Sequence, residues 1–399
     1  MTETRERRFQ LGAAITLAEL EGELHPALAR LRAEEPVSWL PALGAWLVTR
    51  RDLALRVMRD PEIFTVDDPR FSTGRAVGPS MLTRDGGEHE RHRAPFARPF
   101  RLDAVRKRFA TVVRGETDRL IDPIEPAGRA ELRRALAGPL AVVVVAHALG
   151  LGDTDSAQVL RWYDAIVDAV SGAAARRPIT PEGLAAVDEL RERIGPALDA
   201  DPDSSLLAAA AAHGGLTRDE VLSNAAVLMF GGIETTEGMI ANAILHLLQH
   251  PDELALVEAD RSLLAGAVDE SLRLEPAAAV IDRYATRDAE LDGAAIADGD
   301  LVTVSLAAAN RDPAFFPEPD RFDVRRANAR HQVAFAHGPH VCIGMHLARL
   351  EVHTALARLL DRLPRLRLDP ERPASARGLV FRKPPALHVV WDRWENPGS

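Results

Sequence analysis

The longest helical pattern in the chain runs from Thr217 to Gln249 without a proline. It begins with a capping box, in which Thr217 and Glu220 each bond a backbone N–H of the other, and His250-Pro251 ends it. At about 1.5 Å per residue the helix is about 50 Å long, enough to cross a whole domain. The fold must therefore be arranged around one central helix.

The rest of the chain predicts a mainly α protein with a small β region. Val37–Leu40 and Ala45–Thr49 flank a Pro-Ala-Leu-Gly turn and predict a hairpin. Positions 51 to 281 are mostly helical in pattern, apart from a long polar loop over 65–85. Further strands are predicted at Val280–Ala285, Leu301–Ser305, Gly378–Phe381 and Leu387–Trp391. No linker composition divides the chain, so we expect a single domain over 1–399.

Composition narrows the classes of function. The net charge of −10 argues against nucleic acid as a partner. The apolar stretch 135–152 contains Gly138-Pro139 and predicts a buried core helix, not a membrane span. We find no signal peptide pattern, and therefore expect a cytoplasmic protein without membrane contact. We also expect a monomer. Only two of the 49 basic residues are lysines, a bias that indicates a bacterial source.

Two adjacent glycines, Gly231 and Gly232, lie in the middle of the central helix. Each costs about 1 kcal/mol relative to alanine, so a compensating gain is expected. One interpretation is close packing of a crossing helix. The other is that the glycines open the helical ladder while Thr235 bonds back to a carbonyl, which makes a groove beside the acid Glu234 and the Thr235 alcohol.

The chain has a single cysteine, Cys342, in the segment Phe335-Ala-His-Gly-Pro-His-Val-Cys-Ile-Gly344. It cannot form an intrachain disulfide, and an amphipathic helical pattern follows at once. A helix N-terminus stabilises a thiolate through its free N–H groups and its dipole. We interpret Cys342 as a metal ligand; the alternative is a small buried apolar residue.

The spacing Phe335-x-x-Gly-x-His340-x-Cys342-x-Gly344 resembles the haem-binding loop of the cytochrome P450 family. The resemblance covers nearly the whole chain, because five further motifs occur in the family's order. They are His89-x-x-x-Arg93, Gly231-Gly232-x-Glu234-Thr235, Glu270-x-x-Arg273, Arg283-x-Ala-x-x-Asp288 and Asn310-Arg-Asp-Pro313. It implies the cytochrome P450 fold, with the long central helix over a haem and the cysteine loop before a C-terminal helix. One departure is Ala336, where the family usually has glycine.

The resemblance assigns a role to each motif. Cys342 would bind the iron of haem b, and the cofactor would also contact Gly231, Gly232, Phe335 and Gly344. Its propionates would be neutralised by His89, Arg93, Arg283 and His340. Thr235 would donate a hydrogen bond to bound dioxygen, and Glu234 would help to deliver protons.

Glu270 and Arg273 share one face of a helix, where they can form an ion pair. By the resemblance this pair joins an arginine of the segment Pro317–Asp323, and we expect that arginine to be Arg321. The three would stabilise the scaffold below the haem and take no part in the chemistry.

A basic run from His89 to Phe109 contains seven basic and two acidic residues. On an acidic protein it predicts a surface for an acidic partner; the alternative is a solvated helix face. The residues assigned to this surface are Arg91, Arg98, Arg101, Arg106, Lys107 and Arg108. Because the chain has no flavin or iron–sulfur motif of its own, the resemblance implies electrons from a ferredoxin, supplied by a ferredoxin reductase and NAD(P)H.

The implied function is a monooxygenase that inserts one oxygen atom from O₂ into an unactivated C–H bond of a small apolar molecule. The small residues Ala277-Ala-Ala279 favour a bulky secondary metabolite, terpenoid or steroid. A peroxide-driven peroxygenase on the same scaffold is an alternative that the Glu234-Thr235 pair disfavours. A non-catalytic haem sensor or scaffold subunit is a further alternative, disfavoured because the ligand and the oxygen-handling pair are both present.

Overall fold

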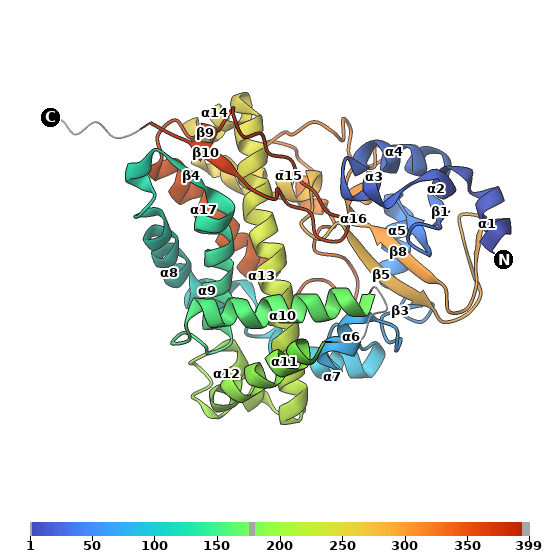
Figure 1. The fold of residues 1–399 in the computed structure, drawn as a ribbon, viewed down its shortest axis with the longest axis horizontal. Coiled ribbons are helices and arrows are strands. Elements are labelled where there is room, and N and C mark those ends of the chain that lie inside the picture. Colours follow the sequence, from blue (N-terminus) through green and yellow to red (C-terminus); the bar gives the residue numbers. More distant parts are fainter. Residues whose placement is uncertain (1, 175–179, 393–399) are drawn as a thin grey trace, which may run out of the picture.

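The computed structural model describes residues 2–174 and 180–392. The central helix, α13 (Arg218–Gln249), passes through the middle of the molecule and is crossed by α10 (Ser156–Ala174) in Figure 1. Both bonds of the predicted capping box are present between Thr217 and Glu220, and the helix ends at His250 as expected.

Helices form most of the chain on both sides of α13. The N-terminal ones are α1 (Thr2–Arg8), α2 (Gln10–Ala14), α3 (Leu17–Glu21), α4 (Leu24–Glu34), α5 (Arg51–Arg59), α6 (Ser72–Val77), α7 (Gly86–Ala97), α8 (Leu102–Ile121), α9 (Gly138–Ala148), α11 (Pro181–Ile194) and α12 (Leu206–His213). After α13 come α14 (Pro251–Ala259), α15 (Leu264–Leu274), α16 (Leu306–Ala309) and α17 (Met345–Arg362).

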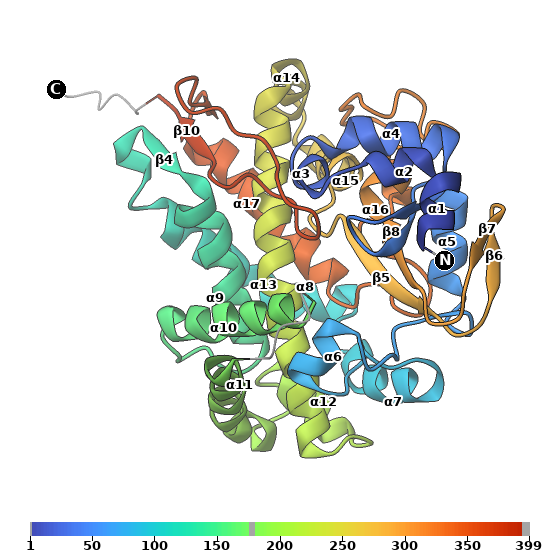
Figure 2. The same cartoon turned by 45° about the vertical axis from the view of Figure 1, so that its right-hand side comes forward.

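The main sheet lies to one side of the helical body (Figures 1 and 2). Its strands follow the order β1 (Val37–Leu40), β2 (Ala45–Val48), β8 (Leu301–Ser305), β5 (Val280–Ala285) and β3 (Phe64–Thr65). Only β2 and β8 are parallel; the predicted hairpin is the antiparallel β1–β2 pair.

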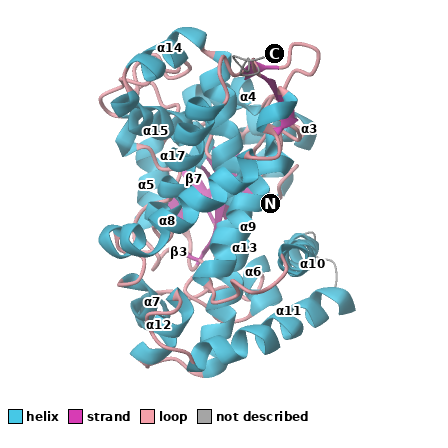
Figure 3. Ribbon diagram, turned by 90° about the vertical axis from the view of Figure 1, so that its left-hand side faces the viewer, coloured by secondary structure: helices cyan, strands magenta, loops and turns pink. Residues whose placement is uncertain are grey.

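Two smaller sheets complete the β region. One contains β4 (Arg129–Glu131), β10 (His388–Val390) and β9 (Arg367–Leu368), and the other is the hairpin β6 (Ala289–Leu291) and β7 (Ala294–Ile296). The strand predicted at Gly378–Phe381 is wrong, because this segment forms only an isolated bridge from Phe381 to Ala278. Helices dominate the molecule when it is coloured by secondary structure (Figure 3).

The apolar stretch 135–152 forms the buried helix α9, as predicted. Pro139 lies just after a π-helical turn (Arg133–Ala137), within a continuous helical segment whose hydrogen-bond ladder is already irregular at this point. The polar segment 65–85, predicted as a loop, contains the short helix α6. Among the described residues no helix combines the length and the apolar character that a membrane span requires.

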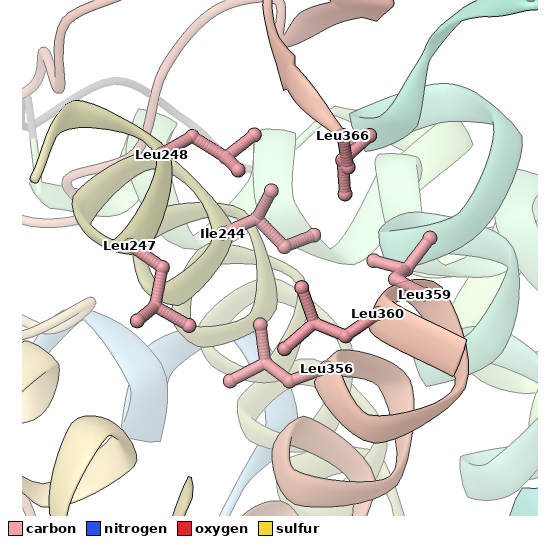
Figure 4. A pocket seen from close by; sticks show the side chains of 7 residues that line it. All are labelled: Ile244, Leu247, Leu248, Leu356, Leu359, Leu360 and Leu366. Carbon is pink, nitrogen blue, oxygen red and sulfur yellow. The ribbon is translucent and has the colours of Figure 1, made fainter. Parts of the chain in front are cut away.

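The C-terminal halves of α13 and α17 pack through leucines and one isoleucine (Figure 4). A void of about 10 Å³ remains between them. Its walls are Ile244, Leu247, Leu248, Leu356, Leu359, Leu360 and Leu366. An apolar void of this size offers no partner for water, so we regard it as a packing gap in the core.

Candidate active site

A cavity of about 480 Å³ lies between α13, the cysteine loop and the start of α17. The walls are largely apolar, and Phe71, Val227, Ala277 and Phe381 are among the residues that line the cavity. Cys342 lies deep in the protein, yet its side chain is accessible because it faces this cavity. The volume is within the range of small-molecule sites.

Backbone bonds determine the shape of the cysteine loop. The N–H of Cys342 donates to Phe335 O at 2.8 Å, and that of Val341 donates to Gly338 O at 3.1 Å. Gly338 has a φ of +76°, and a Cβ there would lie 2.4 Å from Met58 O, so only glycine fits. Helix α17 begins three residues after the cysteine, so the sulfur lies near a helix N-terminus as predicted.

Ala336 has a φ of +59°. The left-handed turn, for which glycine is the usual residue, is therefore present with alanine at this position. The expected cost of this conformation for a residue with a Cβ is about 1–2 kcal/mol. The departure from the family pattern changes the strain in the loop and leaves its shape intact.

Three of the four residues predicted to neutralise propionates line the cavity: Arg93, Arg283 and His340. The fourth, His89, stacks on His340 with ring centroids 4.3 Å apart. His89 Nε2 is buried and has no hydrogen-bond partner among the described residues. Burial lowers the pKa of Arg283 to about 10 and that of His89 to about 4.

These four side chains, together with Cys342, fit a haem. An arginine retains its charge at a pKa of about 10, so Arg93 and Arg283 can pair with carboxylates at neutral pH. A buried ring nitrogen without a partner at His89 is the kind of group that a propionate would satisfy.

An acid that sequence analysis missed lies beside this cluster. Asp85 accepts from His340 at 2.6 Å, and also from Thr65 and from the N–H of Val66. Burial alone would raise the pKa of Asp85, but these hydrogen bonds lower it to about 2. His340 therefore uses Nε2 for Asp85 and has only Nδ1 left for a cofactor. Asp85 directly precedes α7, a position where an aspartate is typical of a helix cap, so the sequence gives no signal for this pairing.

The two glycines of α13 differ: Gly232 supports the packing interpretation, and Gly231 supports only part of the groove interpretation. A Cβ on Gly232 would lie 2.7 Å from Val145 of α9, so this glycine allows close helix packing. A Cβ on Gly231 would meet open space, and Gly231 lines the cavity. The helix runs through both without a break, so the expected opening of its ladder is wrong, while the bond from Thr235 Oγ1 to Gly231 O is present at 2.6 Å.

Glu234 is not among the described residues that line the cavity, although its neighbour Thr235 is. Its carboxylate accepts from Tyr163 Oη of α10 and pairs with Lys383 Nζ at 2.6 Å. Tyr163 and Lys383 were not predicted as site residues.

A second missed acid, Glu351 of α17, lines the cavity and is 2% exposed. Its Oε2 has no hydrogen-bond partner among the described residues. Burial raises the pKa of Glu351 well above its usual range. Burial therefore favours the neutral form of this carboxyl group over its carboxylate.

The predicted ion pair of α15 is present and fully buried, with Arg273 Nε 2.7 Å from Glu270 Oε2. Its third member is not Arg321, as predicted, but Arg326, whose Nε lies 2.8 Å from Glu270 Oε1. The Arg321 side chain is 54% exposed and lies 3.5 Å from Glu318. Arg321 contributes only its carbonyl oxygen, which accepts from both Arg273 and Arg326.

The place of Arg326 in this ion cluster can be tested by its effect on stability. We expect Arg326→Ala to lower the free energy of unfolding by about 3 kcal/mol, because it removes one cation from a fully buried carboxylate. Arg321→Ala is the matched control in the same segment, and should change stability by less than about 0.5 kcal/mol because its carbonyl remains. Denaturant unfolding of the two variants compares them directly. Equal losses would contradict the assignment.

The basic surface is smaller than predicted. Arg98, Arg101, Arg106 and Lys107 are exposed. Arg91 instead pairs with Glu88 at 2.8 Å and with Glu220 at 2.5 Å, while Arg108 is partly buried and donates to the carbonyl of Asp203. We call the four exposed residues the basic patch.

The basic patch lies near the cysteine side of the cavity. Helix α8, which carries Arg106 and Lys107, packs along α17. Burial lowers the pKa of His346, and the charges of Arg349 and Arg106 lower it further. Arg106 is thus close to the first turn of α17, four residues after Cys342.

Comparison with known proteins agrees with this geometry. Residues 201–389 match the cytochrome P450 family. The chain is 38% identical over 396 residues to the cytochrome P450 monooxygenase PikC of Streptomyces venezuelae, covering 94% of this chain and 92% of that protein. The chain belongs to the cytochrome P450 family.

Other relatives have the same character. The 20-oxo-5-O-mycaminosyltylactone 23-monooxygenase of Streptomyces fradiae is 37% identical over 355 residues, covering 85% of this chain and 82% of that one. The crystal structure of CalO2 matches with a TM-score of 0.85 at 28% identity, covering 95% of this chain and 99% of that one. The cytochrome P450 fold predicted from the motifs is therefore confirmed.

Membership of this family settles the class of chemistry. This cytochrome P450 is an oxygen-incorporating oxidoreductase that binds haem b, acts on a small molecule and needs redox partners. It is of the bacterial type, as expected.

Proposed function

We propose that the cavity holds the haem between Cys342 and the Gly231–Thr235 face of α13, and that the protein hydroxylates a bulky apolar metabolite. The observation that carries the proposal is the convergence of one accessible thiol and three basic side chains, Arg93, Arg283 and His340, on a single cavity. When bound through a cysteine thiolate, a haem supplies dioxygen activation, because electron donation from sulfur favours O–O cleavage. The protein supplies orientation and protons.

Thr235 would position water in the groove of α13. Its hydroxyl proton is donated to Gly231 O at 2.6 Å, so the oxygen retains its lone pairs as acceptors. This differs from the donor role expected from the family. In this conformation Thr235 Oγ1 would accept a hydrogen bond from a water or from a protonated reactant beside Gly231.

Glu234 would carry protons between solvent and this groove. It is adjacent to Thr235 in sequence, and its side chain is 13% exposed, so it touches both solvent and the protein interior. A carboxylate that turns about its own side-chain bonds can take a proton on one side and release it on the other.

The substrate would be large and mainly apolar. Ala277 and Ala278 line the cavity with small side chains. Phe230 and Phe381 also line it, and their rings contact each other edge to face at 5.7 Å. Relatives include the tylactone 23-monooxygenase and a vitamin D(3) 25-hydroxylase that is 34% identical over 357 residues. A substrate screen by spin-state difference spectroscopy tests this class, and binding of small polar compounds alone would contradict it.

Electrons would come from an acidic ferredoxin that binds the basic patch. Charged residues on the patch would steer such a partner through a field that salt screens within about 8 Å at physiological ionic strength. We expect the double variant Arg101→Glu/Arg106→Glu to slow reduction by ferredoxin roughly tenfold at low salt. Substrate affinity, measured by difference spectroscopy, should be unchanged.

Arg287→Glu/Arg330→Glu is the matched control, because both arginines are exposed and lie outside the patch. The control carries the same change in net charge, and its reduction rate should stay near the wild-type value. If the two double variants slowed reduction equally, or if the wild-type reduction rate did not depend on salt, the basic run would be only a solvated helix face.

A further inference from the structure

Lys383 lies between two carboxylates of α13. Its Nζ is 2.6 Å from Glu234 Oε1 and also binds Glu237 Oε2. The three side chains are only 11–13% exposed. Glu237 has a second cation, because Arg133 Nε lies 2.8 Å from its Oε1. Two acids and two bases thus form a balanced, largely buried group.

The backbone that carries Lys383 is firmly held. Its N–H and carbonyl both pair with Arg377, and the carbonyl of Arg382 accepts from Asn242 of α13 at 2.9 Å. Gly378 closes this loop with a φ of +110°, where a Cβ would lie 2.1 Å from Phe381 O. The backbone of Lys383 is therefore held in place, and only its side chain needs to move.

Glu234 and Glu237 are three residues apart on one helix and so occupy the same face. A lysine ammonium has three N–H donors, and can keep one carboxylate while it releases the other. If Glu234 turned towards the cavity, Lys383 would still be paired with Glu237. The cost of releasing Glu234 is therefore smaller than the cost of leaving a buried ammonium unpaired.

We propose that Lys383 is a positioning residue that holds Glu234 away from the cavity and remains on Glu237 when Glu234 turns inward to deliver a proton. The inference rests on the proposed role of Glu234. Tyr163 assists by donating to the other oxygen of Glu234 from α10. Proton delivery would then require that two contacts, from two separate elements, are broken first.

The pairing can be measured without turnover, because the chain contains only two lysines. Lys107 is exposed and serves as an internal reference for acylation by an amine-specific reagent, followed by peptide mass spectrometry on the haem-loaded protein. We expect Lys383 to react roughly tenfold more slowly than Lys107, since a charged hydrogen bond must first break.

Variants of the two acids test whether Lys383 is shared between them. Glu234→Gln and Glu237→Gln should each raise the rate at Lys383 only slightly, whereas the double variant should bring it close to that of Lys107. Circular dichroism checks that each variant is folded. If Glu234→Gln alone raised the acylation rate of Lys383 to that of Lys107, the proposal would be overturned, because Glu237 would then not retain the lysine.

Turnover tests the consequence for proton delivery. At saturating ferredoxin, Lys383→Met should raise the solvent deuterium isotope effect on product formation, because the isotope-insensitive breaking of the ion pair no longer precedes proton transfer. Lys383→Arg should keep the wild-type value. A loss of thermal stability in Lys383→Met with an unchanged isotope effect would show a purely structural role and overturn the proposal.

The two hypotheses fail in different ways. If Glu234→Gln changed neither the isotope effect nor the coupling of NAD(P)H to product, the proposed role of Glu234 would be wrong. The labelling rates would still report whether Lys383 is shared between the two acids.

Discussion

Cys342→Ala is expected to abolish the strongly red-shifted Soret band of the reduced carbon monoxide complex. The chain contains no other thiol, and the side chain of Cys342 faces the cavity. Thiolate ligation requires this atom, so the loss should be complete. The measurement is the difference spectrum of the reduced protein with and without carbon monoxide, alongside the haem content per chain.

Met345→Leu is the control for this variant. Met345 carries the next sulfur along the chain, at the first position of α17, and is not among the described residues that line the cavity. Its replacement should leave the band in place. Retention of the band in Cys342→Ala would show that another residue binds the iron.

The central helix and the cysteine loop could be predicted because their signals are local. The capping box, the proline after His250 and the run of apolar residues determine α13 without help from the rest of the chain. The Phe335–Gly344 spacing likewise describes one short loop, whose bonds are mostly internal. The conformation of Ala336 could not be predicted from local signals, since residues with a Cβ rarely adopt the positive φ that the loop requires there.

The ion cluster shows why long-range partners were harder to predict. Arg321 and Arg326 both follow Pro317 in a segment with little regular structure, so no periodicity indicates which side chain turns inward. The contact is decided by the path of the backbone. That path brings Arg326 to Glu270 and leaves Arg321 at the surface.

Lys383 and Tyr163 were missed for a related reason. They meet Glu234 from elements 149 and 71 residues away in sequence, and neither lies in a motif. A lone lysine near the C-terminus is usually a solvated side chain. Only tertiary structure shows that this one is nearly buried between two acids.

Thr235→Ala is expected to leave substrate affinity nearly unchanged while product formed per NAD(P)H consumed falls roughly tenfold. The variant removes the hydroxyl that bonds Gly231 O, and with it the acceptor that Thr235 offers to water in the groove. Loss of one such hydrogen bond, at about 1.4 kcal/mol, corresponds to that factor. The electrons that no longer reach product should appear as hydrogen peroxide.

Thr235→Ser and Thr235→Val separate the effect of the hydroxyl from the effect of side-chain volume. Serine keeps the oxygen, and should retain most of the coupling; valine keeps the volume without the oxygen, and should behave like alanine. Because Gly231 leaves open space beside this position, neither change should disturb the packing of α13. Coupling that follows side-chain volume rather than the hydroxyl would mean that Thr235 acts as part of the cavity wall, and that protons reach the groove by another route.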